Sequence, residues 1–265
     1  MNPLITTDEL SGRLGEVAVR DIRWALTDPN HGRATYQAGH IPGAVFVDLD
    51  TDLSAPPGPG RHPLPSPEDF AASLGRLGIG PDDEVVVYDD AGNTISTRLW
   101  WMLRSIGHEK VRVLDGGYQA WVGEDRVVET GDVAPEPVSY PVRPFTGVAA
   151  HTELAGRPHV DARAPDRYRG DVEPVDPKAG HIPGAINLPV GGNLGPDKRL
   201  LAASALRDRF ESLGDDVVVS CGSGVNACHN ALAMVVAGLP MPDVYVGSYS
   251  EWSRLGFDVT TGSEP

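Results

Sequence analysis

The residue best suited to do chemistry in this chain is Cys221, one of only two cysteines among 265 residues. It lies in "VVVSCGSGVNACHNA", where three valines precede it and small, mostly apolar residues continue toward Gly238. This pattern predicts a buried strand, a tight loop and then a helix. Backbone N–H groups at the amino end of a helix favour the ionised form of a thiol. The stretch therefore predicts a thiolate nucleophile at the carboxyl end of a strand.

The loop after the cysteine is expected to bind an anion through its main chain. Glycine permits positive φ angles, which turn successive N–H groups toward one point. The residues expected to surround the anion are Gly222, Gly224, Val225, Asn226 and Ala227. A buried structural cysteine in a tight turn is the alternative interpretation.

Other cysteine chemistries fit this loop poorly. A phosphatase would need an arginine to hold the phosphate, and none of the six residues after Cys221 is basic. A zinc site needs more thiol or imidazole ligands, and His229 beside Cys228 does not supply them. Seven helical residues rise about 10 Å, too far for a disulfide between Cys221 and Cys228. Cys228 is expected to pack in the core, and no metal site is predicted.

The elements that must position the cysteine are written twice in the chain. "AGHIPGA" occurs at 38–44 and again at 179–185. Three further pairs follow the same order: "VRDIR" with "HVDAR", "DEVVVYD" with "DDVVVSC", and "GGYQAW" with "GSYSEW". Such a long period indicates two similar domains rather than a solenoid. In the first half, Asp89 occupies the position of Cys221.

Each half alternates short apolar strands with helical patterns, which predicts an α/β fold with a mostly parallel sheet flanked by helices. Glycines at 107 and 238 are expected to cap two of the helices. The proline-rich stretch at 124–144 lacks a helical period and is predicted to be a linker. We therefore expect a first domain at 1–123 without the cysteine and a catalytic domain at 145–265.

Composition excludes several classes of function. The net charge of −15 disfavours nucleic acid, since phosphate backbones are bound by clustered lysine and arginine. No apolar run approaches the ~18 residues that cross a bilayer, so no membrane association is expected. The amino terminus lacks the features of a signal peptide, and two cysteines do not form a disulfide framework, which favours the cytoplasm. A small anionic substrate would have to be attracted by local groups.

Together these motifs resemble the two-domain sulfurtransferases of the rhodanese family. The resemblance covers nearly the whole chain and rests on the duplicated "GHIPGA", "CGSGVNAC", "LDGGYQAW" and "RYRGDVEP". It implies two tandem rhodanese-like domains. It also implies that Cys221 takes a sulfane sulfur from a donor as a persulfide and passes it to cyanide or a thiol.

The loop sequence bears on the donor. "CGSGVNA" is similar to the 3-mercaptopyruvate type, "CGSGVTA", and lacks the two basic side chains of the thiosulfate type. The resemblance implies that Ser223 assists proton transfer with a histidine and an aspartate of the first domain, matched by His40 and Asp28. A hydrogen bond within its own turn is the alternative for His40 and is the expectation for His181.

Two basic residues are expected to contact the donor. Arg167, in "RYRG", matches the family arginine that binds the anionic end of the substrate; an ordinary surface arginine is the alternative. Lys178 is the candidate for a second contact, because the chain has no arginine where some relatives carry one. Asp161 and Arg163 are expected to form an internal ion pair.

The sequence thus predicts a cytoplasmic sulfurtransferase that needs no cofactor. Its donor is 3-mercaptopyruvate or thiosulfate and its acceptor is cyanide or a thiol, with a thioredoxin-like protein as a reductant. A persulfide carrier that delivers sulfur to a protein partner is the alternative.

Overall fold

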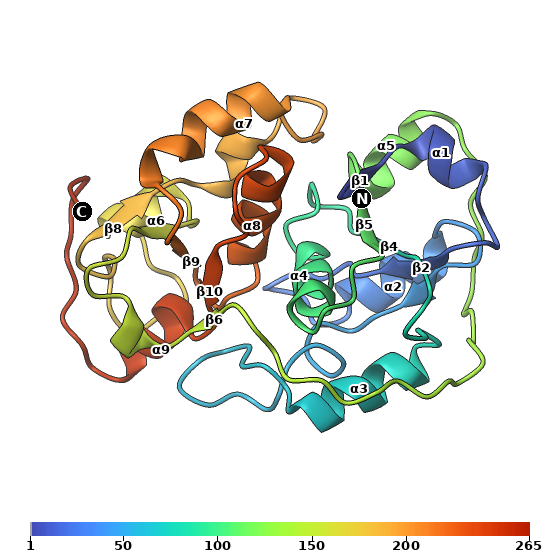
Figure 1. Cartoon of the computed structure of the whole chain (residues 1–265), viewed down its shortest axis with the longest axis horizontal. Coiled ribbons are helices and arrows are strands. Elements are labelled where there is room, and N and C mark those ends of the chain that lie inside the picture. The colour runs from blue at the N-terminus through green and yellow to red at the C-terminus, as the bar shows by residue number, and fades with distance from the viewer. Residues whose placement is uncertain (1) are drawn as a thin grey trace. The chain divides into compact units, whose positions relative to one another are not determined.

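The computed structural model describes residues 2–265 and divides them into two compact units (Figure 1). The first unit contains the chain up to Ala55 together with Pro65–Thr146 and Pro196–Leu200. The second unit contains Pro56–Leu64, Gly147–Gly195 and Leu201–Pro265. The short segment 56–64 therefore comes from the first half of the sequence but packs with the second unit.

The first unit is built on a five-stranded parallel sheet with the strand order β1-β5-β4-β2-β3. Its strands are β1 (Leu4–Ile5), β2 (Ala18–Asp21), β3 (Val45–Phe46), β4 (Val85–Tyr88) and β5 (Val111–Leu114). Its helices are α1 (Thr7–Ser11), α2 (His31–Ala38), α3 (Pro67–Arg76), α4 (Thr97–Ser105) and α5 (Gly117–Gly123).

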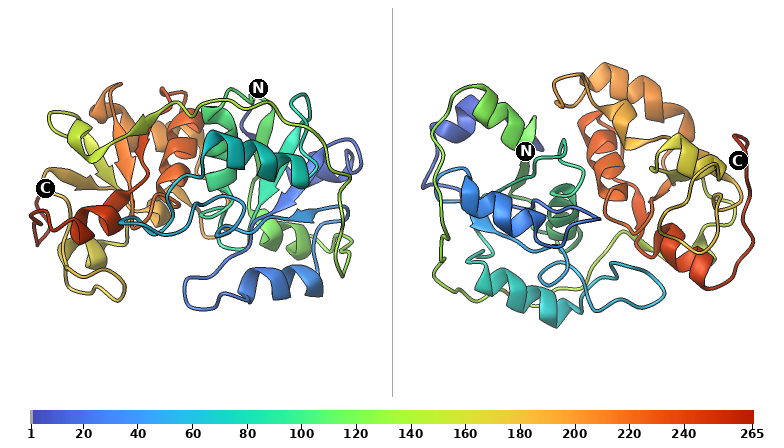
Figure 2. Two further views of the ribbon diagram at one scale, coloured as in Figure 1. Left: turned by 90° about the horizontal axis from the view of Figure 1, so that it is seen from below. Right: turned by 180° about the vertical axis from the view of Figure 1, so that it is seen from behind.

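The second unit repeats this topology strand for strand, with the order β6-β10-β9-β7-β8 and parallel pairing (Figure 2). Its strands are β6 (Val148–Ala149), β7 (His159–Asp161), β8 (Ala185–Asn187), β9 (Val218–Ser220) and β10 (Asp243–Tyr245). Its helices are α6 (Pro165–Arg169), α7 (Ala203–Phe210), α8 (Ala227–Val236) and α9 (Ser248–Arg254), with 3₁₀ turns η1 (His151–Glu153), η2 (Val190–Asn193) and η3 (Glu211–Leu213). The predicted α/β class with two parallel-sheet domains is confirmed.

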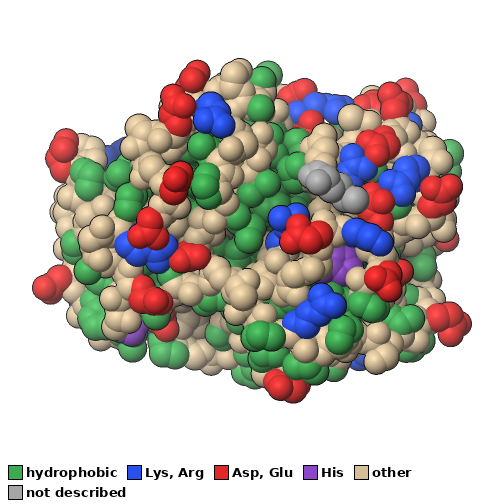
Figure 3. All heavy atoms as spheres, in the orientation of Figure 1, with side chains coloured by type: hydrophobic (Ala, Val, Ile, Leu, Met, Phe, Trp, Pro, Cys, Tyr) green, Lys and Arg blue, Asp and Glu red, His purple; other side chains and the backbone are tan. Residues whose placement is uncertain are grey.

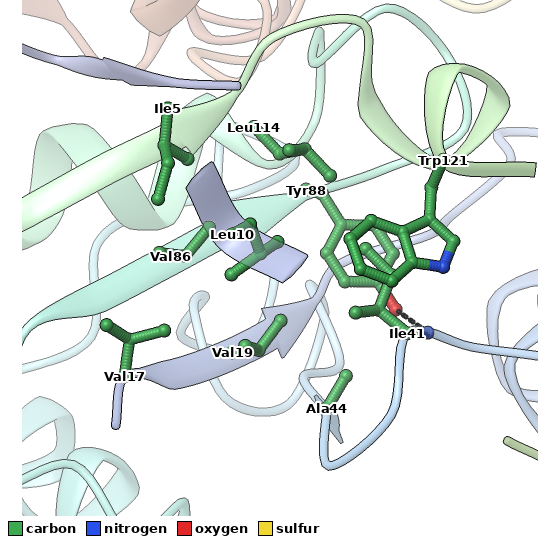
Figure 4. Close-up of a cluster of buried hydrophobic side chains, with 10 residues drawn as sticks. All are labelled: Ile5, Leu10, Val17, Val19, Ile41, Ala44, Val86, Tyr88, Leu114 and Trp121. Atoms are coloured by element: carbon green, nitrogen blue, oxygen red, sulfur yellow. Dashed lines mark hydrogen bonds between the residues drawn. The ribbon is translucent and has the colours of Figure 1, made fainter. Parts of the chain in front are cut away.

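Helices cover both faces of each sheet, and buried side chains fill the space between. In the first unit, Leu10 of α1 lies near Val86 and Trp121 of α5 lies beside Tyr88, and both of these strand residues belong to β4 (Figure 4). The neighbouring strand residues Val85 and Val87 are also fully buried, because α4 packs on β4 and β5 from the opposite face. Burial on both faces explains why these strands read as unbroken valine runs.

The predicted helix ends are also found. α4 is followed by Gly107 with φ of 77°, and α8 is followed by Gly238 with φ of 73°. Both angles lie in the left-handed region, where glycine carries no steric penalty. The predicted linker region between α5 and β6 forms no helix or strand.

The charged side chains are spread over the surface. On the face shown in Figure 3, acidic groups are interspersed with lysine and arginine. Within residues 2–265, none of the helices has both the length and the apolar character that crossing a bilayer requires.

Candidate active site

Cys221 lies at the carboxyl end of β9, the central strand of the second sheet, and a short loop leads from it into α8. Its side chain is free and 3% exposed. The carboxyl edge of a parallel sheet is where ligands of open α/β folds bind. The loop is held from the side of α9, because the N–H of Cys221 donates to Ser248 Oγ at 3.0 Å and the N–H of Tyr249 donates to Cys221 O at 3.0 Å.

The two glycines of the loop have different surroundings. Gly224 has φ of 77°, and a Cβ atom there would lie 2.4 Å from Val246 O, so both the backbone angle and the contact exclude a side chain. At Gly222, an added Cβ atom would lie 2.7 Å from Nη2 of Arg61 and 3.5 Å from Nη1 of Arg167. The missing side chain at 222 therefore gives two arginines access to the loop.

The first unit contains a loop in the equivalent position. Asp89 follows β4 as Cys221 follows β9, and Gly92 has φ of 74°, as Gly224 has 77°. The Asp89 carboxylate is fully buried inside its own loop and accepts hydrogen bonds from four backbone N–H groups. The donors, at 2.7–2.8 Å, belong to Ala91, Asn93, Ile95 and Ser96.

The matching positions in the second unit are Ser223, Val225, Ala227 and Cys228. The Cys228 N–H donates to Val225 O at 3.1 Å, at the start of α8. The other three positions correspond to donors that surround a buried anion in the first unit. The second loop thus shares the glycine turn of the first and carries a sulfur nucleophile in place of the carboxylate, while Val225 lacks the positive φ of Asn93.

A histidine contacts the loop, but it is not the one expected. His62 Nδ1 and Ser223 Oγ lie 2.8 Å apart and share a hydrogen bond, and both side chains are buried. His62 belongs to the segment 56–64 of the second unit. Sequence analysis missed it because "APPGPGRHPLP" has no regular period and no counterpart in the other repeat. The absence of a counterpart was itself a sign that this segment has a role outside the shared fold.

The expected proton-transfer role for His40 is not what its surroundings indicate. Its ring is fully buried in the first unit, stacks on Tyr36 at 4.1 Å and has Nδ1 3.0 Å from Tyr36 O. His181 repeats this arrangement with Tyr168, at 3.7 Å and 2.8 Å. Because both repeats keep the same contacts, the histidine of "GHIPGA" supports the fold that they share.

Asp28 has a local role as well. It is exposed in the turn before α2, where its carboxylate accepts a hydrogen bond from the N–H of Asn30 at 3.0 Å. Asparagine and aspartate commonly stabilise turns in this way. The structure links Asp28 to its own turn rather than to Ser223.

Arg167 does lie beside the cysteine loop. It extends from α6 and its side chain is 19% exposed. Its Nη2 is 2.7 Å from Glu173 Oε1 and 3.3 Å from Asp176 Oδ2. Burial raises the pKa of Glu173, but hydrogen bonds from Arg167 and from backbone N–H groups outweigh it and leave this pKa lowered. Arg167 is therefore oriented by two carboxylates, with Nη1 toward Gly222.

Lys178 does not reach the loop. Its ammonium group donates to Gly256 O at 2.9 Å and to Phe257 O at 2.8 Å, just beyond the end of α9. A cation at this place satisfies carbonyls that the helix leaves unpaired. The expectation that Lys178 binds the donor is corrected by these contacts.

The expected ion pair of Asp161 and Arg163 is present and buried, with 2.7 Å between Oδ2 and Nη2. The Arg163 guanidinium also lies over the Tyr249 ring at 3.8 Å. Asp21 and Arg23 form the same 2.7 Å pair in the first unit. This duplicated pair is structural.

The second cysteine is part of the core. Cys228 is fully buried in α8 and its thiol lies 3.3 Å from Gly224 O. Among residues 2–265, no group of three or more histidine, cysteine, aspartate or glutamate side chains is arranged to hold a metal ion.

Comparison with known proteins identifies the family and the fold. The rhodanese-like domain family matches residues 6–124 and again 148–255. The chain belongs to the rhodanese family. A Pseudomonas aeruginosa protein named as a probable 3-mercaptopyruvate sulfurtransferase is 43% identical over 267 residues, covering 94% of both chains. Mouse thiosulfate sulfurtransferase is 36% identical over 263 residues, covering 92% of this chain and 88% of that protein.

A solved structure agrees with these rhodanese-family relatives. The 3-mercaptopyruvate sulfurtransferase from Leishmania major superposes with a TM-score of 0.87 at 33% identity, covering 96% of this chain and 74% of that one. The rhodanese-family chain described here is accordingly an enzyme that transfers sulfur.

Proposed function

We propose that Cys221 carries the sulfur as a persulfide and that 3-mercaptopyruvate is the preferred donor. The observation that carries this proposal is the hydrogen bond between Ser223 and His62 in the loop that Cys221 begins. The names of the relatives include both donors, so they do not choose between them.

The first half-reaction needs a proton. The Cys221 thiolate attacks the sulfur of 3-mercaptopyruvate, an S–S bond forms, and the C–S bond breaks. The electron pair of the broken bond passes to the substrate carbon as the enolate of pyruvate, which must then be protonated. Thiosulfate instead releases sulfite, a stable anion that needs no proton. A serine–histidine pair is useful only with the first donor.

The second half-reaction returns the thiolate. The acceptor, cyanide or a thiol, attacks the outer sulfur of the persulfide, and the electron pair of the S–S bond returns to Cys221. The products are thiocyanate or a new persulfide, which a thioredoxin-like dithiol can reduce. The N–H groups of the loop stabilise the negative charge in both steps. Two free cysteines are compatible with a reducing cytoplasm.

Arg167 orients the donor in this proposal, because its Nη1 atom faces Gly222 beside the nucleophile. A guanidinium binds a carboxylate with defined geometry. The site would therefore hold 3-mercaptopyruvate by its carboxylate and present its sulfur to Cys221.

The test is sulfur transfer with each donor, followed by intact mass. We expect 3-mercaptopyruvate to give higher kcat/KM than thiosulfate and to add the mass of one sulfur atom to Cys221. A clear preference for thiosulfate would overturn the donor assignment. Transfer only to a specific protein, with slow turnover of cyanide and small thiols, would support the persulfide carrier instead.

A further inference from the structure

Arg61 is the second arginine at the cysteine loop, and the family resemblance does not include it. It stands next to His62 in segment 56–64, which is fastened to α9. The Arg61 N–H donates to Ser250 Oγ at 3.1 Å, and Arg254 Nη1 donates to Pro59 O at 3.2 Å. The segment is thereby fixed at two points on either side of Gly60.

Only part of the hydrogen-bonding capacity of the Arg61 guanidinium is satisfied within the second unit. Nη1 pairs with Asp176 Oδ1, while Nε is buried and has no hydrogen-bond partner among the described residues. Nη2 faces the cysteine loop, 2.7 Å from the position of a Cβ atom at Gly222. One edge of this cation is therefore directed at the loop that contains the nucleophile.

Asp176 couples the two arginines at the loop. Its side chain is fully buried and contacts Arg61 through Oδ1 and Arg167 through Oδ2. Burial raises the pKa of Asp176, and Arg61 opposes the shift most strongly. Asp176 pairs with Nη1 of Arg61 and with Nη2 of Arg167. The other terminal nitrogen of each arginine, Nη2 of Arg61 and Nη1 of Arg167, lies toward Gly222.

The side-chain charges around the loop balance, so an added anion would be held by the unused N–H groups of Arg61 rather than by an excess of positive charge. Three arginines and three carboxylates balance in this cluster, and they are Arg61, Arg163, Arg167, Asp161, Glu173 and Asp176. Burial lowers the pKa of Arg61, and charge on Asp176 and on Cys221 opposes this shift. Bringing an anionic donor to this partly buried cation restores the charge-assisted contacts that burial removes.

We propose that Arg61 and Arg167 together bind the anionic end of the sulfur donor, with Asp176 as the positioning residue that sets their spacing. This rests on the proposed sulfur-transfer function. A carboxylate has two oxygens and a sulfonate three, so either can accept one N–H from each guanidinium. Arg61 thus supplies the second cationic contact that sequence analysis assigned to Lys178.

The experiment compares Arg61→Gln, Arg61→Lys and the control Arg254→Gln. Arg254 holds the same segment through Pro59 O but its guanidinium is not directed at Gly222. We expect Arg61→Gln to raise the donor KM by roughly 10- to 100-fold, in keeping with the loss of a charge-assisted hydrogen bond, with a smaller effect on kcat. Arg61→Lys should recover part of the loss, and Arg254→Gln should change KM far less than Arg61→Gln, because Ser250 still holds the segment.

Binding of thiosulfate to the Cys221→Ser protein, measured by calorimetry, separates this proposal from the catalytic one. Adding Arg61→Gln should weaken that binding by a similar factor even if the protein transfers sulfur poorly. An unchanged KM and unchanged binding in Arg61→Gln would overturn the assignment of Arg61 while leaving the persulfide mechanism intact. Equal losses in Arg61→Gln and Arg254→Gln would also overturn it, because the position of the segment would then be the cause.

Discussion

His62 Nδ1 lies 2.8 Å from Ser223 Oγ, although 161 residues separate them in the chain. The contact exists because segment 56–64 packs with the second unit, where Ser223 lies two residues after the nucleophile. Under the proposed mechanism, this pair would move the proton that the release of pyruvate requires.

Replacement of either partner should therefore affect the two donors unequally. For His62→Gln and Ser223→Ala we expect turnover of 3-mercaptopyruvate to fall by roughly 10²–10⁴-fold, the usual contribution of a positioned acid or base. Thiosulfate turnover should fall much less, since sulfite leaves without a proton. Steady-state rates with both donors measure this, with His31→Gln in the first unit as the control. Equal losses with both donors would contradict a proton-transfer role.

Cys221→Ser should abolish persulfide formation with the fold unchanged. Serine is close in size, and the main chain of this loop is held by hydrogen bonds that do not involve the thiol. Intact mass after exposure to either donor would show no added sulfur, while thermal unfolding would match the wild type. Cys228→Ser provides the comparison, because that buried thiol should not be needed for sulfur loading. Sulfur retained on Cys221→Ser would refute Cys221 as the carrier.

Several of these relationships could be predicted from the sequence, and others could not. The valine runs, the glycine after each helix and the duplicated blocks are local patterns, so the two sheets and the position of Cys221 follow from them. The contacts of Arg61 and His62 depend on where an irregular loop packs. The sequence of this loop has no helical or strand periodicity from which that position could be predicted. The family resemblance pointed to His40, but His181 repeats its contacts in the second unit, and a histidine kept in both units is better explained by the fold that the units share.

Two Gly→Ala variants would separate the cost of the backbone angle at Gly224 from the cost of its contact with Val246. Gly224→Ala should lower the free energy of unfolding by several kcal/mol, because it adds a 2.4 Å clash with Val246 O to the left-handed strain. Gly184→Ala has a similar φ of 82° but open space around its Cβ position, and should cost only about 1–2 kcal/mol. Urea unfolding of both variants gives the difference. Similar losses would show that the contact with Val246 is relieved by movement of the loop.

Stability should also depend on His159, which lies on β7 beside the strand that leads to Cys221. Burial lowers the pKa of His159 to about 4, and Asp161 only partly opposes this. The unfolded chain binds a proton below pH ~6.5 that the folded protein resists, so stability falls as the pH decreases from 6.5 toward 4. Between pH 7 and pH 5 this one group should cost about 2 kcal/mol.

Urea unfolding of the wild type and His159→Gln at both pH values would isolate that contribution. The variant should lose less stability on acidification than the wild type, even if it is less stable at pH 7 because the 2.7 Å contact with Ser220 has changed. The same loss on acidification in both proteins would show that other groups govern the pH response.

The Asp89 carboxylate has a consequence for how the enzyme behaves while it works. In the first unit the loop is permanently satisfied by an anion that is part of the chain. In the second unit, the proposed mechanism places the equivalent negative charge on Cys221 or on the persulfide sulfur that it carries. Loading with sulfur should therefore change how well this loop is satisfied, and with it the stability of the second unit. Under this proposal the protein should be least stable when no donor is present.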